Sequence, residues 1–189
     1  MTLNSCNISQ KLCKKKQILK KYLWKKPLIQ RFMSPNIGIS PKNLKKSATI
    51  LATILSNEMT LYVKTRKFHW NISGNSFMEL HKLFEDQYRI LEANIDEVAE
   101  RISQLGEKTI GTMKEFIENS TLKESPKEYA SQKHMLSELL ENHEQLVTEF
   151  RNYIPVFENE TNDAGSADFV TGLLQQHEKM AWILRRYQV

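Results

Sequence analysis

The sequence contains few residues that break helices, with six glycines and five prolines among 189 residues. Leu, Glu, Lys and Gln are plentiful instead, and this composition favours an all-α fold. The only cysteines, Cys6 and Cys13, lie near the N-terminus, so we predict no disulfide framework and a cytoplasmic location. No apolar run reaches the roughly 18 residues that a membrane-spanning helix needs, so we expect no membrane association.

Acidic residues are missing from the N-terminal part of the chain. Residues 1–46 hold twelve of the 27 Lys and Arg residues and none of the 22 Asp and Glu residues, which leaves a formal charge of −7 on the remainder. The sequence therefore predicts a basic N-terminal tail, residues 1–39, and an acidic helical domain, residues 40–189. An acidic domain suits a protein that collects cations, because carboxylates around narrow openings raise the local cation concentration.

Apolar residues recur every three or four positions in four long segments, which is the pattern of amphipathic helices. The connection between the second and third segments is long enough for the third helix to run parallel to the second, with the fourth antiparallel to both. We therefore predict an all-α four-helix bundle. Its long helices are expected at about 40–68, 75–106, 131–159 and 166–187, with a short helix near 112–120 in the long connection.

Four residues of metal-ligand type lie symmetrically along the second helix: His81, Glu85, Asp96 and Glu100. At a rise of about 1.5 Å per residue, each pair spans ~6 Å and the two pairs are ~16 Å apart. Metal–ligand bonds are only about 2 Å long, so a single helix cannot close all four around one ion. An antiparallel helix from a second copy, crossing near position 90, would place each pair opposite the other pair of the partner subunit.

These ligand types suit iron. Imidazole together with carboxylates binds Fe(II), and is also compatible with Zn or Mn, whereas a closed structural zinc site would favour thiolates. Charged residues four positions apart are often ordinary solvated helix surface, but here they are placed symmetrically beside an apolar face. We therefore predict two mixed nitrogen and oxygen sites in each dimer, both built across the interface. A histidine in the position of His69, taken alone, is more often a capping or packing residue than a ligand.

Two segments of the chain resemble a known family. Residues 61–106, LYVKTRKFHWNISGNSFMELHKLFEDQYRILEANIDEVAERISQLG, closely resemble the signature of the Dps (DNA protection during starvation) family of dodecameric mini-ferritins. Residues 163–188, DAGSADFVTGLLQQHEKMAWILRRYQ, are similar to that family's last helix. The resemblance implies a ferritin-like bundle with an iron site between two-fold-related subunits, in which His69, His81 and Glu85 come from one chain and Asp96 and Glu100 from the other. Glu85 stands where this family often has Asp.

The resemblance also implies a function. A ferroxidase of this kind oxidises Fe(II), with hydrogen peroxide more readily than with dioxygen, and stores the ferric mineral in a hollow shell of twelve subunits. Larger ferritins use Glu-x-x-His on two helices of one bundle, and this sequence contains no Glu-x-x-His. His134, His143 and His177 are therefore expected at the surface or in supporting positions. The alternative, a structural oligomer without the chemistry, is disfavoured because all five ligand positions hold competent residues.

The basic tail allows three interpretations. In the first, its lysines make non-specific contacts with DNA phosphates, twelve tails act together, and the protein associates with the nucleoid. In the second, residues 1–32 are an upstream extension, because Met33 begins MSPNIGIS, like a normal start for the family. In the third, the acid-free N-terminus is an organelle transit peptide, although it is rich in Lys rather than Arg. The candidate DNA-binding residues are Lys14, Lys15, Lys16, Lys20, Lys21, Lys25 and Lys26.

Overall fold

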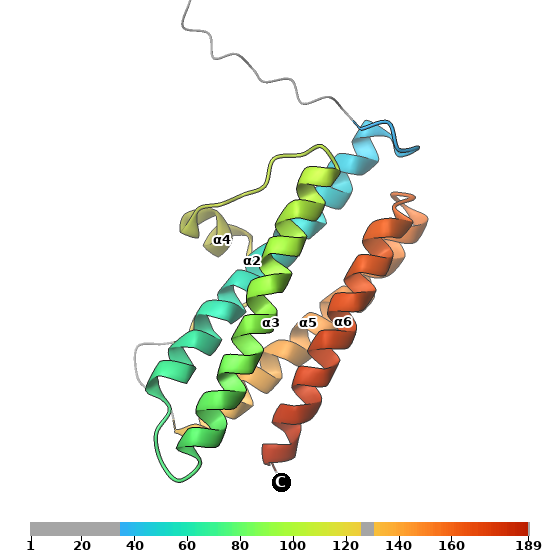
Figure 1. Cartoon of the computed structure of the whole chain (residues 1–189). Coiled ribbons are helices and arrows are strands. Elements are labelled where there is room, and N and C mark those ends of the chain that lie inside the picture. Colours follow the sequence, from blue (N-terminus) through green and yellow to red (C-terminus); the bar gives the residue numbers. More distant parts are fainter. Residues whose placement is uncertain (1–34, 126–130, 189) are drawn as a thin grey trace, which may run out of the picture. The chain divides into compact units, whose positions relative to one another are not determined.

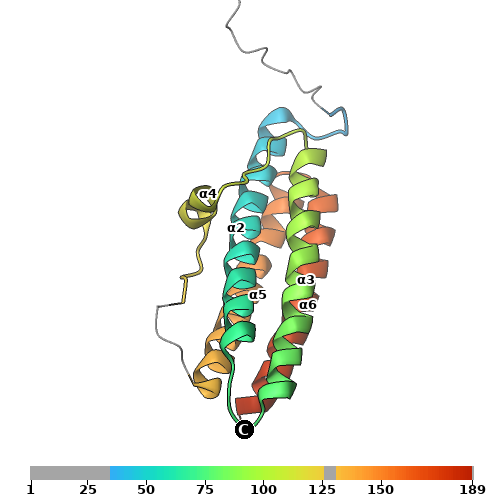
Figure 2. The same ribbon diagram turned by 60° about the vertical axis from the view of Figure 1, so that its left-hand side comes forward.

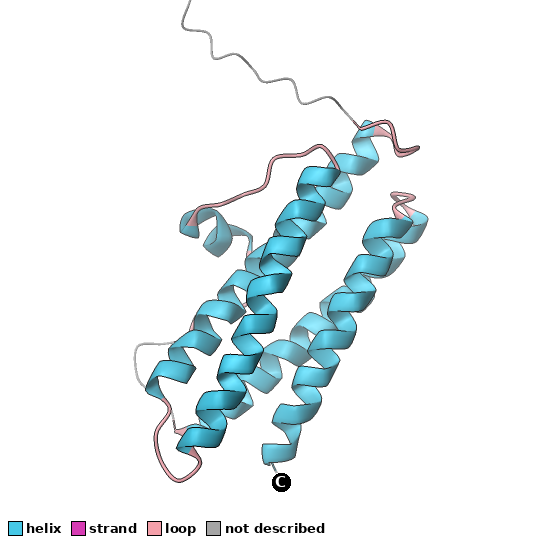
Figure 3. Ribbon diagram, viewed as in Figure 1, coloured by secondary structure: helices cyan, strands magenta, loops and turns pink. Residues whose placement is uncertain are grey.

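The structure, a computed structural model, describes residues 35–125 and 131–188. Within these ranges the chain forms helices and no strands, as the sequence predicts (Figures 1 and 3). Residues 1–34 of the basic tail, which include the candidate DNA-binding lysines, lie outside the described residues. In chain order the helices are α2 (Pro41–Asn71), α3 (Phe77–Gln104), α4 (Met113–Asn119), α5 (Gln132–Asn159), α6 (Ala164–Arg185) and the short 3₁₀ helix η1 (Arg186–Gln188).

The four long helices form a bundle in the predicted topology. Figures 1 and 2 show α2 running in one direction, α3 and α5 in the opposite direction, and α6 returning alongside α5. The connection between α3 and α5 allows this arrangement, because it returns the chain to the end of the bundle at which α3 begins. Within that connection, α4 packs against α2 on the outside of the bundle (Figure 2). None of the described helices combines the length and the apolar character that crossing a membrane requires.

Capping residues fix the starts of the helices. At the start of α2, Asn43 N donates a hydrogen bond to Ser40 Oγ at 3.3 Å. Pro41 occupies the first helical turn, where its missing N–H leaves no hydrogen bond unmade. At the start of α4, the side chain of Thr112 accepts from Glu115 N, and the Glu115 carboxylate accepts from Thr112 N. These signals explain why the starts of the helices could be predicted to within a few residues.

The ends of α2 and α3 matter for the position of the candidate ligands. The structure continues α2 to Asn71, beyond the expected end near Phe68, so His69 lies in the last helical turn. After α3, Gly106 has a φ of +81°, a left-handed conformation that favours glycine. A Cβ atom at Gly106 would lie 2.5 Å from Pro35 Cδ, so the close approach of the chain also requires glycine.

The core lies where the α2–α3 pair packs against the α5–α6 pair. Each large apolar side chain buried there stabilises the fold by roughly 1.5–3 kcal/mol. On α3, three residues of the predicted apolar face are only partly covered: Phe77 is 39% exposed, and Tyr88 and Ile95 are half-buried. They leave an apolar surface on α3 beside the candidate ligands. The largest fully buried side chains are Phe68, Phe84, Phe150, Phe157, Leu51, Ile54, Leu55, Leu61, Leu80, Leu91, Ile102 and Leu105.

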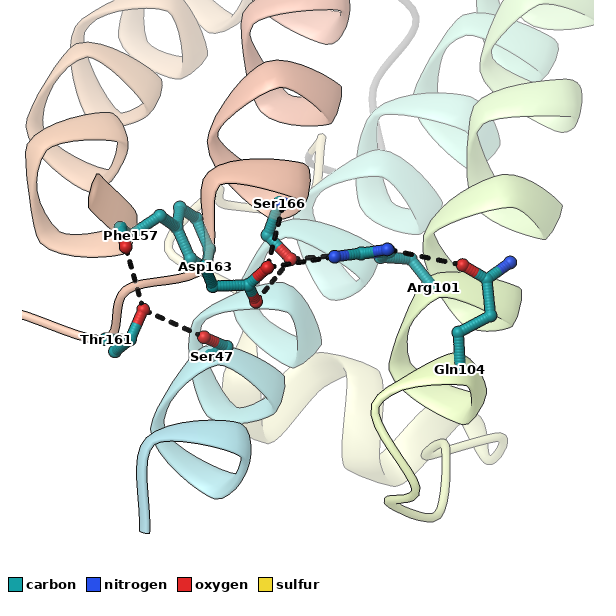
Figure 4. Close-up of polar contacts among 7 residues, drawn as sticks. All are labelled: Ser47, Arg101, Gln104, Phe157, Thr161, Asp163 and Ser166. Atoms are coloured by element: carbon teal, nitrogen blue, oxygen red, sulfur yellow. Dashed lines mark hydrogen bonds and ion pairs between the residues drawn. The ribbon is translucent and has the colours of Figure 1, made fainter. Parts of the chain in front are cut away.

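A partly buried ion pair joins α3 to the start of α6 (Figure 4). Arg101 Nη2 lies 2.9 Å from Asp163 Oδ1, and Arg101 Nε donates to Ser166 Oγ at 3.0 Å. Asp163 also caps α6, because its Oδ1 accepts a hydrogen bond from Ser166 N at 3.0 Å. In the same region, Ser47 Oγ donates to Thr161 Oγ1 at 3.1 Å and links α2 to the α5–α6 turn.

The interior of the bundle contains a polar cluster that the sequence did not predict. His143 and His177 are fully buried, whereas His134 is exposed, so the expectation of a surface position holds for His134 alone. His177 Nε2 donates to Glu58 Oε1 at 2.8 Å, and the Nδ1 atoms of the two buried histidines are 2.9 Å apart. Burial disfavours the cationic form of His143, and repulsion from His177 adds to this, so its pKa lies well below the usual value.

Candidate metal centre

A tight turn between α2 and α3 brings His69 and His81 together. His69 lies in the last turn of α2, and His81 lies early in α3. Gly74, in the connecting loop, has a φ of +107°, and a Cβ there would lie 3.0 Å from Gln132 Nε2. Only glycine adopts this backbone conformation without strain. As a result the two imidazole rings stack, with centroids 3.7 Å apart and an angle of 22° between their planes.

Reciprocal hydrogen bonds fix the tautomers of the two histidines. His69 Nδ1 donates to the backbone oxygen of His81 at 2.8 Å, and His81 Nδ1 donates to the backbone oxygen of His69 at 2.9 Å. A carbonyl oxygen can only accept, so both Nδ1 atoms carry a proton. In the neutral imidazole, Nε2 then keeps its lone pair. Histidines that bind metals are commonly oriented in this way, with the second nitrogen donating to a carbonyl or a carboxylate.

Glu85 lies one helical turn after His81 and supplies a carboxylate on the same helix. Its side chain is 24% exposed and is held by Arg89, whose Nε and Nη2 both donate to Glu85 Oε1, at 3.0 and 2.6 Å. Lys82 Nζ lies 3.7 Å from Glu85 Oε2. The hydrogen bond from Arg89 lowers the pKa of Glu85, and the charges of Lys82 and Arg89 lower it further. The carboxylate is therefore ionised, the form in which it binds cations.

Asp96 and Glu100 lie further along α3, are exposed to solvent, and are not gathered with the two histidines. In the described part of one chain, no group of three or more His, Cys, Asp or Glu side chains is placed to hold a metal ion. The structure thus brings His69, His81 and Glu85 into one neighbourhood and leaves Asp96 and Glu100 apart from it. Among the described residues, one chain does not bring these five side chains together.

Aromatic residues surround the histidine pair. The Tyr88 ring meets His69 edge-on, with centroids 5.2 Å apart, and the Phe77 ring lies 5.1 Å from that of His81. The Arg66 guanidinium stacks on the Tyr88 ring, 4.7 Å from its centroid. Sequence reasoning missed the positions of Arg66 and Arg89. The Arg89 contact had a signal, because Glu followed by Arg four residues later is a favourable pair on a helix.

Comparison with known proteins identifies the family. A model of the ferritin-like domain matches residues 48–188. The chain is 39% identical over 152 residues to the low temperature-induced protein all0458 of Nostoc sp., an alignment that covers 80% of this chain and 85% of that protein. It is 30% identical over 143 residues to DNA protection during starvation protein 2 of Bacillus anthracis, covering 76% and 97% of the two chains.

A solved structure agrees with this result. The Dps protein of Vibrio cholerae O1, described as a member of a broad superfamily of ferritin-like diiron-carboxylate proteins, has a TM-score of 0.77 with this chain at 28% identity. The match covers 83% of this chain and 98% of that one. The protein therefore belongs to the Dps family of ferritin-like proteins.

Proposed function

We propose that this protein stores iron and acts as a ferroxidase. It oxidises Fe(II), preferably with hydrogen peroxide, at sites between two-fold-related subunits, and it keeps the ferric product inside a shell of twelve copies. The pairing of His69 with His81 is the observation that supports this function, because two hydrogen bonds to backbone carbonyls leave both Nε2 lone pairs free for a metal. The relatives named for DNA protection and the diiron-carboxylate description of the Vibrio protein agree with it.

The ligands fit iron as a substrate. His69, His81 and Glu85 offer two imidazole nitrogens and an ionised carboxylate from one chain. Asp96 and Glu100 of the partner subunit complete the set when the α3 helices of two copies cross near position 90. Carboxylate oxygens are hard ligands that stabilise Fe(III) relative to Fe(II) and so favour oxidation. Two Fe(II) ions together supply the two electrons that cleave the O–O bond of one peroxide molecule.

Protection of DNA follows from this chemistry. Free Fe(II) and hydrogen peroxide generate hydroxyl radicals, and a protein that consumes both removes the source of the damage. A second contribution would come from the basic tail, which we propose binds DNA phosphates without sequence preference. The acidic remainder of the chain, with a formal charge of −7, would attract Fe(II) rather than DNA. These functions are those of a cytoplasmic protein that associates with the nucleoid.

Subunit mixing tests whether the site is shared. His81→Ala and Glu100→Gln each remove one ligand, so each variant alone should lose rapid oxidation of anaerobically bound Fe(II) after peroxide is added. When the two variants are co-expressed, a shared site is intact only in mixed pairs, where one of two sites keeps all of its ligands. Random pairing then restores roughly one quarter of the wild-type sites. Failure of the co-expressed sample to recover any oxidation would contradict a site built from two chains.

A further inference from the structure

Arg89 forms hydrogen bonds with the carboxylate of Glu85, which the proposed function assigns to iron as a ligand. Two of its nitrogens, Nε and Nη2, donate to Glu85 Oε1 at 3.0 and 2.6 Å. A hydrogen bond between charged groups contributes roughly 1.5–3 kcal/mol, so this contact competes with a cation for the Glu85 carboxylate. For Glu85 to bind iron through this oxygen, Arg89 must find another acceptor, since a guanidinium left unpaired between two subunits is costly.

The symmetry of α3 supplies that acceptor. Two copies of the helix that cross between positions 90 and 91 place Glu85 at the level of Asp96 of the partner subunit. The same relation places Arg89 at the level of Glu92 of the partner subunit, one helical turn nearer to the crossing point. In the single chain Glu92 is exposed, and Tyr62 Oη approaches its Oε1 only at 3.5 Å, the outer limit for a hydrogen bond. The charge of Glu92 also acts on Arg66 and Arg89 of its own chain, so pairing with a second copy would replace these longer-range interactions by a hydrogen bond.

We propose that Arg89 is a positioning residue with two alternative carboxylate partners. In the unassembled chain it holds Glu85, and when two copies pair it moves to Glu92 of the partner subunit and frees Glu85 for iron. Assembly and metal affinity are then coupled. The pairing of two subunits completes the set of ligands and also moves the Arg89 guanidinium away from Glu85. This inference rests on the proposed function, since it concerns a ligand of the same centre.

Charge reversal tests the contact between subunits. Arg89→Glu and Glu92→Arg each give one chain two like charges on neighbouring turns, so each variant alone should dissociate at a higher protein concentration than the wild type. A mixture of the two variants places opposite charges across the interface and should form stable assemblies that contain both chains, as native mass spectrometry can measure. Pairing within one helix cannot produce this recovery. A mixture no more stable than either variant alone overturns the contact.

Metal binding tests the release of Glu85. Glu92→Gln removes the negative charge of the alternative acceptor without touching a ligand. Arg89 then stays on the charged Glu85, and the affinity of the assembled protein for Co(II), measured by its visible absorption, should fall about tenfold. The double variant Arg89→Gln with Glu92→Gln removes the competitor and should bind Co(II) within about threefold of the wild type. If the double variant binds as weakly as Glu92→Gln, Glu92 acts in another way and the role of Arg89 is overturned.

Glu85→Gln separates this inference from the proposed function. If that variant loses Co(II) binding while Glu92→Gln binds like the wild type, the centre is correct and only the movement of Arg89 is wrong. If Glu85→Gln itself binds Co(II) like the wild type, Glu85 is not a ligand and the proposed centre fails.

Discussion

Glu58 and His177 form a hydrogen-bonded pair in the interior of the bundle, with Glu58 Oε1 2.8 Å from His177 Nε2 and both side chains completely buried. His143 extends the pair through its Nδ1 atom, so α2, α5 and α6 are joined by one polar chain. Glu58 Oε2 and His143 Nε2 have no protein partner among the described residues. Buried polar groups that are only partly satisfied are costly, so stability should be sensitive to changes at this cluster.

The protonation of His143 should make the fold less stable in acid. The pKa of this residue is depressed in the folded state, so the folded protein keeps it neutral while the unfolded chain takes up a proton below about pH 6.5. Stability is therefore fully present at neutral pH and is lost as the pH falls, by up to about 1.4 kcal/mol per pH unit from this group. Urea unfolding at pH 7.5 and 5.5 measures the loss, which His143→Gln should reduce. His134→Gln is the matched control, because it removes an imidazole that is exposed rather than buried.

Replacing one member of the Glu58–His177 pair should lower the free energy of unfolding more than replacing both. Glu58→Leu leaves the His177 N–H without an acceptor in the core, and we expect the free energy of unfolding to fall by roughly 3 kcal/mol. The double variant Glu58→Leu with His177→Leu replaces the pair by apolar side chains and should recover much of that loss, as thermal unfolding can measure. Additive losses in the double variant would show that the two residues act independently.

The fold was predictable because its signals are local. Ser40 and Pro41 mark the start of α2, and the periodic apolar residues of α3 identify the buried face of that helix. The buried polar cluster had no such signal. Glu58 and His177 are 119 positions apart, and neither spacing nor composition shows that two distant helices will place them in contact. Their meeting depends on how the helices pack, which the sequence pattern of each helix does not specify.

The spacing of the candidate ligands could be derived from the sequence for a different reason. His81, Glu85, Asp96 and Glu100 share one helix, so their separations follow from helix geometry alone. The hydrogen bonds between the imidazoles and the opposite carbonyls were not predictable, because they depend on how the turn at Gly74 folds His69 back onto His81. Only the structure shows that both imidazole rings are oriented with their Nε2 atoms free.

Deletion of residues 1–33 tests whether the basic tail binds DNA. If Lys14–Lys16, Lys20, Lys21, Lys25 and Lys26 contact phosphates, the logarithm of the affinity of the full chain for duplex DNA should fall with the logarithm of salt concentration with a slope of about −6. The truncated protein should lose DNA binding and keep the oxidation of Fe(II), as gel shifts and peroxide titrations can show. Equal DNA retention before and after truncation would assign the binding, if any, to the helical domain. Mass spectrometry of the native N-terminus shows whether the tail is present at all.

The turn at Gly74 should control both stability and metal binding. Gly74→Ala forces a Cβ into a backbone with a φ of +107° and places it 3.0 Å from Gln132 Nε2, so we expect a loss of roughly 1–3 kcal/mol in unfolding free energy. Because this turn aligns His69 with His81, the variant should also bind Co(II) more weakly at temperatures where it is fully folded. Gly111→Ala is the matched control, since Gly111 lacks a positive φ and its Cβ would meet no atom within 4 Å. If Gly74→Ala is destabilised but binds Co(II) like the wild type, the two histidines do not depend on this turn for their alignment as ligands.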